Sequence, residues 1–333
     1  MNKPPEEYRQ IPAAQLIALG ENCLEAAGLS AADARQLAQL LTNSDLRGVR
    51  SHGTRALYGY CRTVRDGRVN ATPNTEIVRE TDTSILVDGD GGLGYAPTML
   101  VTEKAIEKAK IKGIAVGATR CIGHYGSAGH YVRRAMDENC TAYSVQGAYP
   151  QYYTSNEDKR AAHYGNPPLC FGFPGQNKAP VILDGATCIL ADYQRGEEIE
   201  AIESQIPAAF FKSMGYTAIG TLLGGAFVGQ ADPRAEEIAQ QWPGARLGSL
   251  VVVMNLGLFA PAEQVRRGVD ELGRLASEQL IPIAGYDEAT LPGAIEHRKE
   301  SEYRRDGVPI ALEDIQRLEE CAAEFGITPP WQS

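Results

Sequence analysis

The sequence has few of the features that place a protein at a membrane or on a nucleic acid. No apolar run approaches the roughly 20 residues needed to cross a bilayer, and residues 1–7 are polar and acidic, unlike a signal peptide. Positive charge is also in deficit, since 32 Lys and Arg stand against 42 Asp and Glu, a net charge of −10. We therefore expect a cytoplasmic protein that binds neither nucleic acid nor a membrane.

Cysteine and histidine are sparse, and their spacing argues against a metal site or a disulfide framework. The seven cysteines are scattered and include no Cys-x-x-Cys pair, so we expect reduced, mostly buried thiols. Among the five histidines, His124 and His130 are the closest pair, and their spacing is a poor match to a helical zinc motif. We therefore predict no metal site.

Helical patterns occupy both ends of the chain, and strand patterns occupy its middle. Residues 11–42 read as two helices, and residues 250–255 form an apolar, β-branched run typical of a central strand. At 43% hydrophobic and 22% charged residues, the composition is that of an ordinary globular protein. This order predicts an α/β fold in which the two terminal segments pack together.

A glycine-rich loop at residues 89–94 matches the outline of a dinucleotide-binding fingerprint. It reads Gly-Asp-Gly-Gly-Leu-Gly and lies between an expected strand and an expected helix, with another strand after the helix. The fingerprint also needs an acidic residue at the end of that second strand to hold a ribose. Here that strand ends at residues 117–120, Gly-Ala-Thr-Arg. We favour a glycine-rich turn over a phosphate-binding loop.

Candidate catalytic residues are concentrated in residues 43–57. A helix is expected from Arg55, which makes Ser51 its N-cap and places His52 at its first turn. A histidine there can donate a proton, while Arg55 on the same face holds a carboxylate. The same spacing is also typical of a purely structural Ser-His pair, so both interpretations stand.

Four other positions are candidates on local grounds. His124 lies between glycines in a loop whose backbone is open to a ligand. Asp184 closes an apolar strand, where α/β proteins place their chemistry, although it is equally a candidate helix cap. Tyr149 begins an aromatic loop that either lines a pocket mouth or packs on it. Lys212 precedes an expected helix at residues 214–228 and is either an anion contact or an exposed lysine.

Several motifs together resemble the malate/L-lactate dehydrogenase-like oxidoreductases, which are separate from the Rossmann-fold lactate dehydrogenases. Relatives in that group include sulfolactate, ureidoglycolate and piperideine-2-carboxylate enzymes. The motifs are Asp-Leu-Arg-Gly-Val-x-Ser-His-Gly at 45–53, Gly-His-Tyr-Gly at 123–126, Leu-Asp-x-Ala-Thr at 183–187, Lys212 before a glycine-rich helix, and Pro-Gly-x-x-Glu at 292–296. Their order spans nearly the whole chain.

The resemblance implies a non-Rossmann, mixed seven-stranded sheet with helices and a helical unit formed by the N- and C-terminal segments. Residues 1–75 and 284–333 would form a substrate and dimerisation domain. Residues 76–118 and 178–283 would form an NAD(P)-binding-like domain, and residues 119–177 a small third domain. The protein would be a homodimer with its active site near the interface.

The implied activity is the reduction of a small 2-oxo acid or cyclic 2-imino acid, or the oxidation of a 2-hydroxy acid, with NADH or NADPH. His52 would supply the proton, within a catalytic set of Ser51, His52, His124 and Asp184. Asp184 would set the tautomer and charge of a nearby histidine. The substrate carboxylate would contact Arg55, Arg47 and Tyr149. The cofactor would contact Ser144, Asp184, Ala186, Phe211, Lys212, Pro292, Gly293 and Ala294.

Departures from the family pattern fall mostly on the cofactor side. Arg55 stands three residues after His52 rather than four, and Gln194 replaces a lysine. Pro167 lies in an altered Gly-Asn-Pro-Pro segment, and the linker at residues 195–206 is short. An alternative is therefore a scaffold with a lost or altered nicotinamide site. It would act as a cofactor-independent lyase, isomerase or cyclase, or as a ligand-binding homologue.

Overall fold

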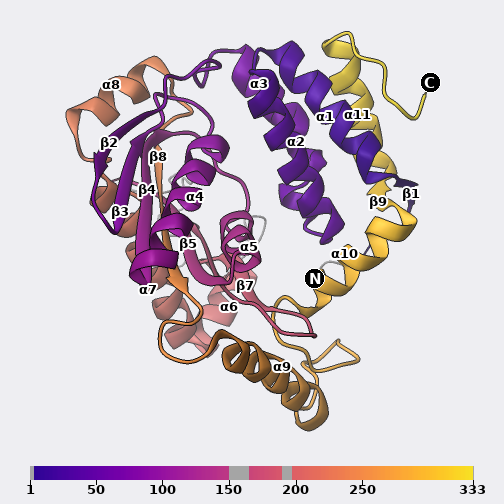
Figure 1. Cartoon of the computed structure of the whole chain (residues 1–333). Helices are drawn as coiled ribbons and strands as arrows, with labels where there is room; N and C mark the ends of the chain where they lie inside the picture. The colour runs from indigo at the N-terminus through magenta and orange to yellow at the C-terminus, as the bar shows by residue number, and fades with distance from the viewer. Residues whose placement is uncertain (1–3, 150–164, 190–196, 333) are drawn as a thin grey trace.

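A computed structural model describes residues 4–149, 165–189 and 197–332, and a mixed seven-stranded sheet lies at its centre (Figure 1). The strand order is β2-β3-β4-β8-β5-β6-β7, and β3 and β4 are the one parallel pair among these described strands. The strands are β2 (Glu76–Glu80), β3 (Ser84–Asp88), β4 (Ile114–Ile122), β5 (Cys140–Ala148), β6 (Pro168–Phe173), β7 (Val181–Ala186) and β8 (Leu247–Asn255). The mixed seven-stranded sheet expected from the resemblance is confirmed.

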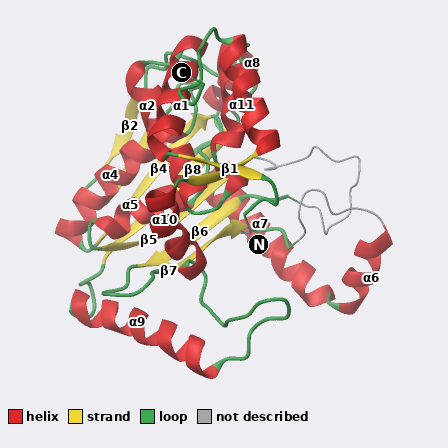
Figure 2. Ribbon diagram, turned by 90° about the vertical axis from the view of Figure 1, so that its right-hand side faces the viewer, coloured by secondary structure: helices red, strands yellow, loops and turns green. Residues whose placement is uncertain are grey.

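Helices cover the two faces of the sheet unequally. Helices α4 (Tyr95–Lys112) and α5 (Gly129–Asp137) pack on one face, where Ala142 of β5 joins their apolar core. Helix α7 (Pro207–Gly224) lies against the opposite face, where Val145 is buried. Because side chains alternate along a strand, residues 142 and 145 necessarily point to opposite faces. Figure 2 shows α4 and α5 beside the strands, with α9 (Ala262–Gln279) below them.

The two ends of the chain lie side by side. Strand β1 (Tyr8–Ile11) pairs antiparallel with β9 (Val308–Ala311). The indigo and yellow helices in Figure 1 share one buried core, which includes Leu19 and Leu318. Those helices are α1 (Ala13–Ala27), α2 (Ala31–Leu46), α3 (Leu57–Arg65), α10 (Ala294–Asp306) and α11 (Leu312–Glu324). The remaining α-helices in the described part of the chain are α6 (Glu197–Gln205) and α8 (Pro233–Gln241).

Two expected helix starts were wrong. The chain after Ser51 forms two 3-10 turns, η1 (Arg50–His52) and η2 (Thr54–Ala56), and α3 begins only at Leu57. Gly53 has an extended backbone (φ −91°, ψ −162°), which interrupts the helical path, so Ser51 is no α-helix N-cap. Helix α7 begins at Pro207, whose fixed φ suits the first helical position, so Lys212 lies inside the helix rather than at its start.

The predictions for cysteine agree with the structure. None of the seven cysteines is in a disulfide bond, and every one except Cys188 is buried. Within the described ranges, no helix combines the length and the apolar character needed to cross a membrane.

Candidate active site

The turn that carries His52 is held in place by a buried carboxyl group. Asp45, near the end of α2, accepts hydrogen bonds from the backbone N–H of Thr54 (2.8 Å) and from its hydroxyl (2.6 Å). A Cβ atom at Gly53 would lie 1.7 Å from Asp45 Oδ1, so only glycine fits beside that carboxyl. Burial raises the pKa of Asp45 to about 7, against the opposing effect of the Thr54 hydrogen bonds.

His52 and His124 lie together although 72 positions separate them in the sequence. Their ring centroids are 5.9 Å apart with an interplanar angle of 29°. The β4–α5 loop delivers His124, and the η1 turn delivers His52 with Ser51 Oγ 3.0 Å from its Nδ1. The structure therefore brings together three of the four predicted catalytic residues in one small volume.

Both histidines are biased towards the neutral form. Burial lowers the pKa of His124 to about 4, and the neighbouring His52 adds to that effect. Burial also lowers the pKa of His52, whereas the negative charge of Asp184 acts to raise it. A neutral imidazole beside a carboxylate can accept a proton and carry it as imidazolium.

Asp184 reaches this centre through its charge rather than through a hydrogen bond to a ring. It lies on β7, in register with Cys170 of β6, which in turn is in register with Ser144 of β5. Its Oδ2 accepts from Ser127 Oγ (2.6 Å) and from the backbone N–H of Gly129 (3.1 Å). The expected effect of Asp184 on the charge of a nearby histidine is present at His52, while the hydrogen bonds of its Oδ2 go to α5 and the loop before it.

The predicted substrate arginines are engaged with acids from the C-terminal helices. Arg55 Nε lies 3.3 Å from Asp314 Oδ1, and Arg47 Nε lies 2.9 Å from Glu300 Oε2. Arg50, which the motif reasoning passed over, lies 2.7 Å from the same Asp314. Burial lowers the pKa of Arg47 to about 10. Arg55 is the more exposed of the two predicted arginines and so the better placed to meet a ligand.

Most of the predicted cofactor residues lie on or beside β7, at both ends of that strand. Thr187, next to Ala186, accepts a hydrogen bond at its carbonyl from Ser213 Oγ of α7, beside Lys212 (2.9 Å). The backbone N–H of Ile182 donates to the carbonyl of Pro292 (2.9 Å), which places residues 292–294 against the same strand. Phe211 and Lys212 are exposed, whereas Ser144 is fully buried and its hydroxyl lies 3.3 Å from that of Tyr125.

The remaining predicted positions lie away from the two histidines or outside the described residues. Tyr149 is exposed and follows β5 directly. Gln194 lies outside the described residues, as does the start of the 195–206 linker, whose remainder includes α6. Pro167 accepts a hydrogen bond at its carbonyl from the N–H of Thr187 (3.1 Å), so it borders the same strand end.

The glycine-rich loop at residues 89–94 does not fit a phosphate group. The N–H groups of Gly89, Gly91 and Gly94 donate to the backbone carbonyls of Arg120, Cys121 and His124 at 2.9 to 3.0 Å. A Cβ at Gly91, where φ is +78°, would lie 2.4 Å from the Trp242 ring. These glycines serve close packing, which agrees with their interpretation as a structural turn.

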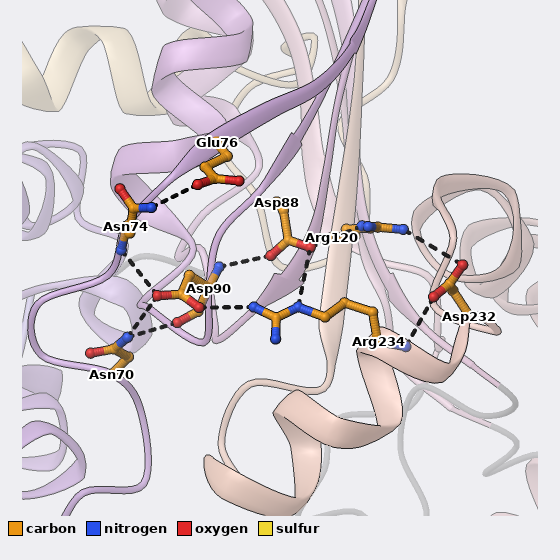
Figure 3. Close-up of polar contacts among 8 residues, drawn as sticks. All are labelled: Asn70, Asn74, Glu76, Asp88, Asp90, Arg120, Asp232 and Arg234. Atoms are coloured by element: carbon orange, nitrogen blue, oxygen red, sulfur yellow. Dashed lines mark hydrogen bonds and ion pairs between the residues drawn. The ribbon is translucent and has the colours of Figure 1, made fainter.

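A pocket of about 310 Å³ lies at the opposite edge of the sheet from β7, between β2–β4 and α8. Figure 3 shows that its charged side chains bind one another. Arg120 Nε lies 3.0 Å from Asp88 Oδ2, and Arg234 Nη2 lies 3.0 Å from Asp90 Oδ1. We infer that these ion pairs stabilise the fold and do not form a ligand-binding site. Within the described ranges, no three His, Cys, Asp or Glu side chains are grouped to hold a metal ion.

Two tyrosines that the motifs did not indicate also belong to the histidine centre. The Tyr60 hydroxyl lies 2.5 Å from His124 Nδ1, and the Tyr95 hydroxyl donates to Tyr60 (2.9 Å). Tyr60 comes from α3 and Tyr95 from the first residue of α4. No local sequence signal marks either tyrosine; Tyr95 is buried in the structure, where a phenol needs a polar partner.

Comparisons with known proteins place the chain in a family. A family model described as malate/L-lactate dehydrogenase matches residues 11–208. L-sulfolactate dehydrogenase of Methanocaldococcus jannaschii is 30% identical, over 90% of this chain and 92% of that protein. A ureidoglycolate dehydrogenase (NAD(+)) of Escherichia coli O157:H7 is 25% identical, over 90% and 91%. The structure of malate dehydrogenase from Pyrococcus horikoshii OT3 matches with a TM-score of 0.82 at 22% identity, covering 98% of both chains. The chain therefore belongs to the malate/L-lactate dehydrogenase family of oxidoreductases.

Proposed function

We propose that the protein is an NAD(P)-dependent dehydrogenase of a small 2-hydroxy acid, or a reductase of the matching 2-oxo or cyclic 2-imino acid. The main observation behind this proposal is the pair of half-buried histidines, whose ring centroids are 5.9 Å apart, beside the charge of Asp184. The names of the sulfolactate and ureidoglycolate dehydrogenases support a 2-hydroxy acid as substrate. In oxidation, His52 takes the hydroxyl proton, and in reduction it returns that proton.

Two opposing effects on the pKa of His52 suit the transfer of a proton to and from its ring. Burial favours the neutral base, while Asp184 lowers the cost of the imidazolium form that follows proton transfer. Ser51 Oγ, 3.0 Å from Nδ1, holds the ring orientation. Arg55 is the candidate for the substrate carboxylate, because a guanidinium can bind that group through two parallel hydrogen bonds. To do so it must share its charge with Asp314.

The residues around β7 have the charge and the small size that a nicotinamide dinucleotide site needs. Lys212 supplies an exposed positive charge for phosphate, and Ala186 leaves the strand end open. Residues 292–294 supply a turn in which Gly293 has φ +98°. We assign these residues, with Ser144, Asp184 and Phe211, to a cofactor site of non-Rossmann type. A bound nicotinamide supplies the hydride acceptor or donor.

We further propose that the terminal segments (1–75 and 284–333) form the substrate unit, that residues 76–118 and 178–283 form the cofactor unit, and that residues 119–177 form a small third domain. A homodimer is supported by an apolar stripe across the sheet. Phe171 stands opposite Leu183 in the adjacent strand, and the two are 46% and 51% exposed. A second copy of the chain is the proposed cover for this stripe.

The test is turnover by the purified protein. NAD(+) or NADP(+) is supplied with malate, sulfolactate, lactate or ureidoglycolate, and formation of the reduced nicotinamide is followed by absorbance. The His52→Gln variant should lose roughly 10²- to 10⁴-fold in kcat, the usual contribution of a positioned acid or base. His297→Gln, at an exposed position on α10, is the matched control. Absence of NAD(P)H binding at millimolar concentration would refute the proposal.

A further inference from the structure

Two hydrogen-bonding groups meet at one nitrogen of the His124 ring, and a third group binds one of them. The Tyr60 hydroxyl is 2.5 Å from Nδ1, and the backbone N–H of Gly126 is 3.3 Å from the same atom. The Tyr95 hydroxyl is 2.9 Å from the Tyr60 hydroxyl and donates to it. Gly126 has φ +80°, and a Cβ there would lie 2.4 Å from the Tyr95 hydroxyl, so glycine allows the amide and the phenol to approach together.

The direction of these hydrogen bonds follows from the Gly126 amide. A backbone N–H can only donate, so His124 Nδ1 must accept and cannot itself carry a proton. The Tyr60 hydroxyl must then also donate to Nδ1, which leaves its oxygen to accept from Tyr95. In the arrangement that fits all three contacts, the single lone pair of Nδ1 is shared between the close Tyr60 hydroxyl and the more distant Gly126 amide, and the proton of the neutral ring is on Nε2.

We propose that Tyr60 and Tyr95 are positioning residues that hold His124 as its neutral Nε2–H tautomer. His124 is then a fixed hydrogen-bond donor to the reacting oxygen or nitrogen of the substrate, and His52 is the group that exchanges the proton. This division of roles rests on the proposed function, whereas the tautomer rests only on the geometry.

The surroundings act in the same direction. Protonation of Nδ1 would set a second N–H against the Gly126 amide, in addition to the burial and the His52 charge that lower the pKa of His124. Burial raises the pKa of Tyr60 to about 12, so this phenol keeps the proton that it donates. His52 differs, because its Nδ1 faces the Ser51 hydroxyl, which can donate or accept.

The tautomer can be measured by NMR on the full chain labelled with ¹⁵N-histidine. The chain has only five histidines, and a His124→Gln variant identifies the signals of this one. Long-range ¹H–¹⁵N spectra distinguish a protonated ring nitrogen from an unprotonated one. We expect His124 to carry its proton on Nε2 at every pH from 5.5 to 8.5. A proton on Nδ1, or titration near the ordinary histidine pKa of about 6.5, would overturn the proposal.

Two Tyr-to-Phe variants on the same helix test the role of the hydroxyl. Tyr60→Phe removes the donor to His124, while Tyr58→Phe removes a hydroxyl that binds Glu324. One net hydrogen bond contributes about 1 kcal/mol, so Tyr60→Phe should weaken the Nε2–H preference about fivefold and shift the Nδ1 signal. Identical Nδ1 signals in the two variants would refute a role for Tyr60.

Kinetics separate this inference from the proposed function. In the active enzyme, Tyr60→Phe should lower kcat more than it raises KM, because the affected hydrogen bond strengthens in the transition state. If no nicotinamide-dependent turnover exists, the proposed function fails while the NMR result still decides the tautomer. If turnover exists but Tyr60→Phe equals Tyr58→Phe in kcat, KM and Nδ1 signal, the inference alone fails.

Discussion

Replacement of Asp45 by asparagine should change how stability depends on pH. Burial raises the pKa of this carboxyl group from 3.8 to about 7, while Thr54 and the Arg50 charge act in the opposite direction. The negative charge of Asp314 adds to the effect of burial. Asparagine keeps the shape and an oxygen acceptor for Thr54 but has no titrating proton.

The sign follows from proton binding. Because the folded-state pKa is the higher one, the folded protein binds more protons between pH 3.8 and about 7 than the unfolded chain. The stabilisation is fully present below the lower value and is lost as the pH rises through the upper one. With these two values, the contribution of Asp45 falls by about 2–3 kcal/mol between pH 5 and pH 8.

Urea unfolding followed by circular dichroism, at one protein concentration and several pH values, measures this effect. The free energy of unfolding of Asp45→Asn should gain about 2–3 kcal/mol relative to the native sequence between pH 5 and pH 8. Glu25→Gln, at an exposed position on α1, controls for loss of a carboxylate. Parallel pH profiles for Asp45→Asn and the native protein would refute the reasoning.

Three further outcomes are expected. Gly53→Ala should cost at least about 2 kcal/mol of stability by urea unfolding and should lower kcat, because its Cβ would overlap Asp45 Oδ1; unchanged values would mean that the carboxyl can move aside. Asp314→Ala leaves Arg50 and Arg55 without their shared acid and should cost roughly 3 kcal/mol, whereas the exposed Glu313→Ala should cost little. Leu183→Lys should convert the proposed homodimer to monomer in analytical ultracentrifugation, and an unchanged mass would exclude that stripe as the interface.

Periodicity along the chain was sufficient to predict the first helices and the central strand β8. These elements depend on neighbours within a few residues, which a sequence displays directly. The seven-stranded mixed sheet came from the resemblance and is confirmed. Local signals failed at Ser51 and Lys212, where an extended glycine and a helix-starting proline moved the helix boundaries.

The resemblance of the motifs and their order was enough to identify an oxidoreductase family and to single out His52, His124 and Asp184. They did not reveal what these residues contact. Arg55 is bound by an acid near the other end of the chain. Tyr60 and Tyr95 come from different helices, and only the packing of α3 and α4 against the β4–α5 loop brings their hydroxyls to His124. Hydrogen-bond partners so distant in sequence follow no period, so only the tertiary structure shows which groups surround each histidine.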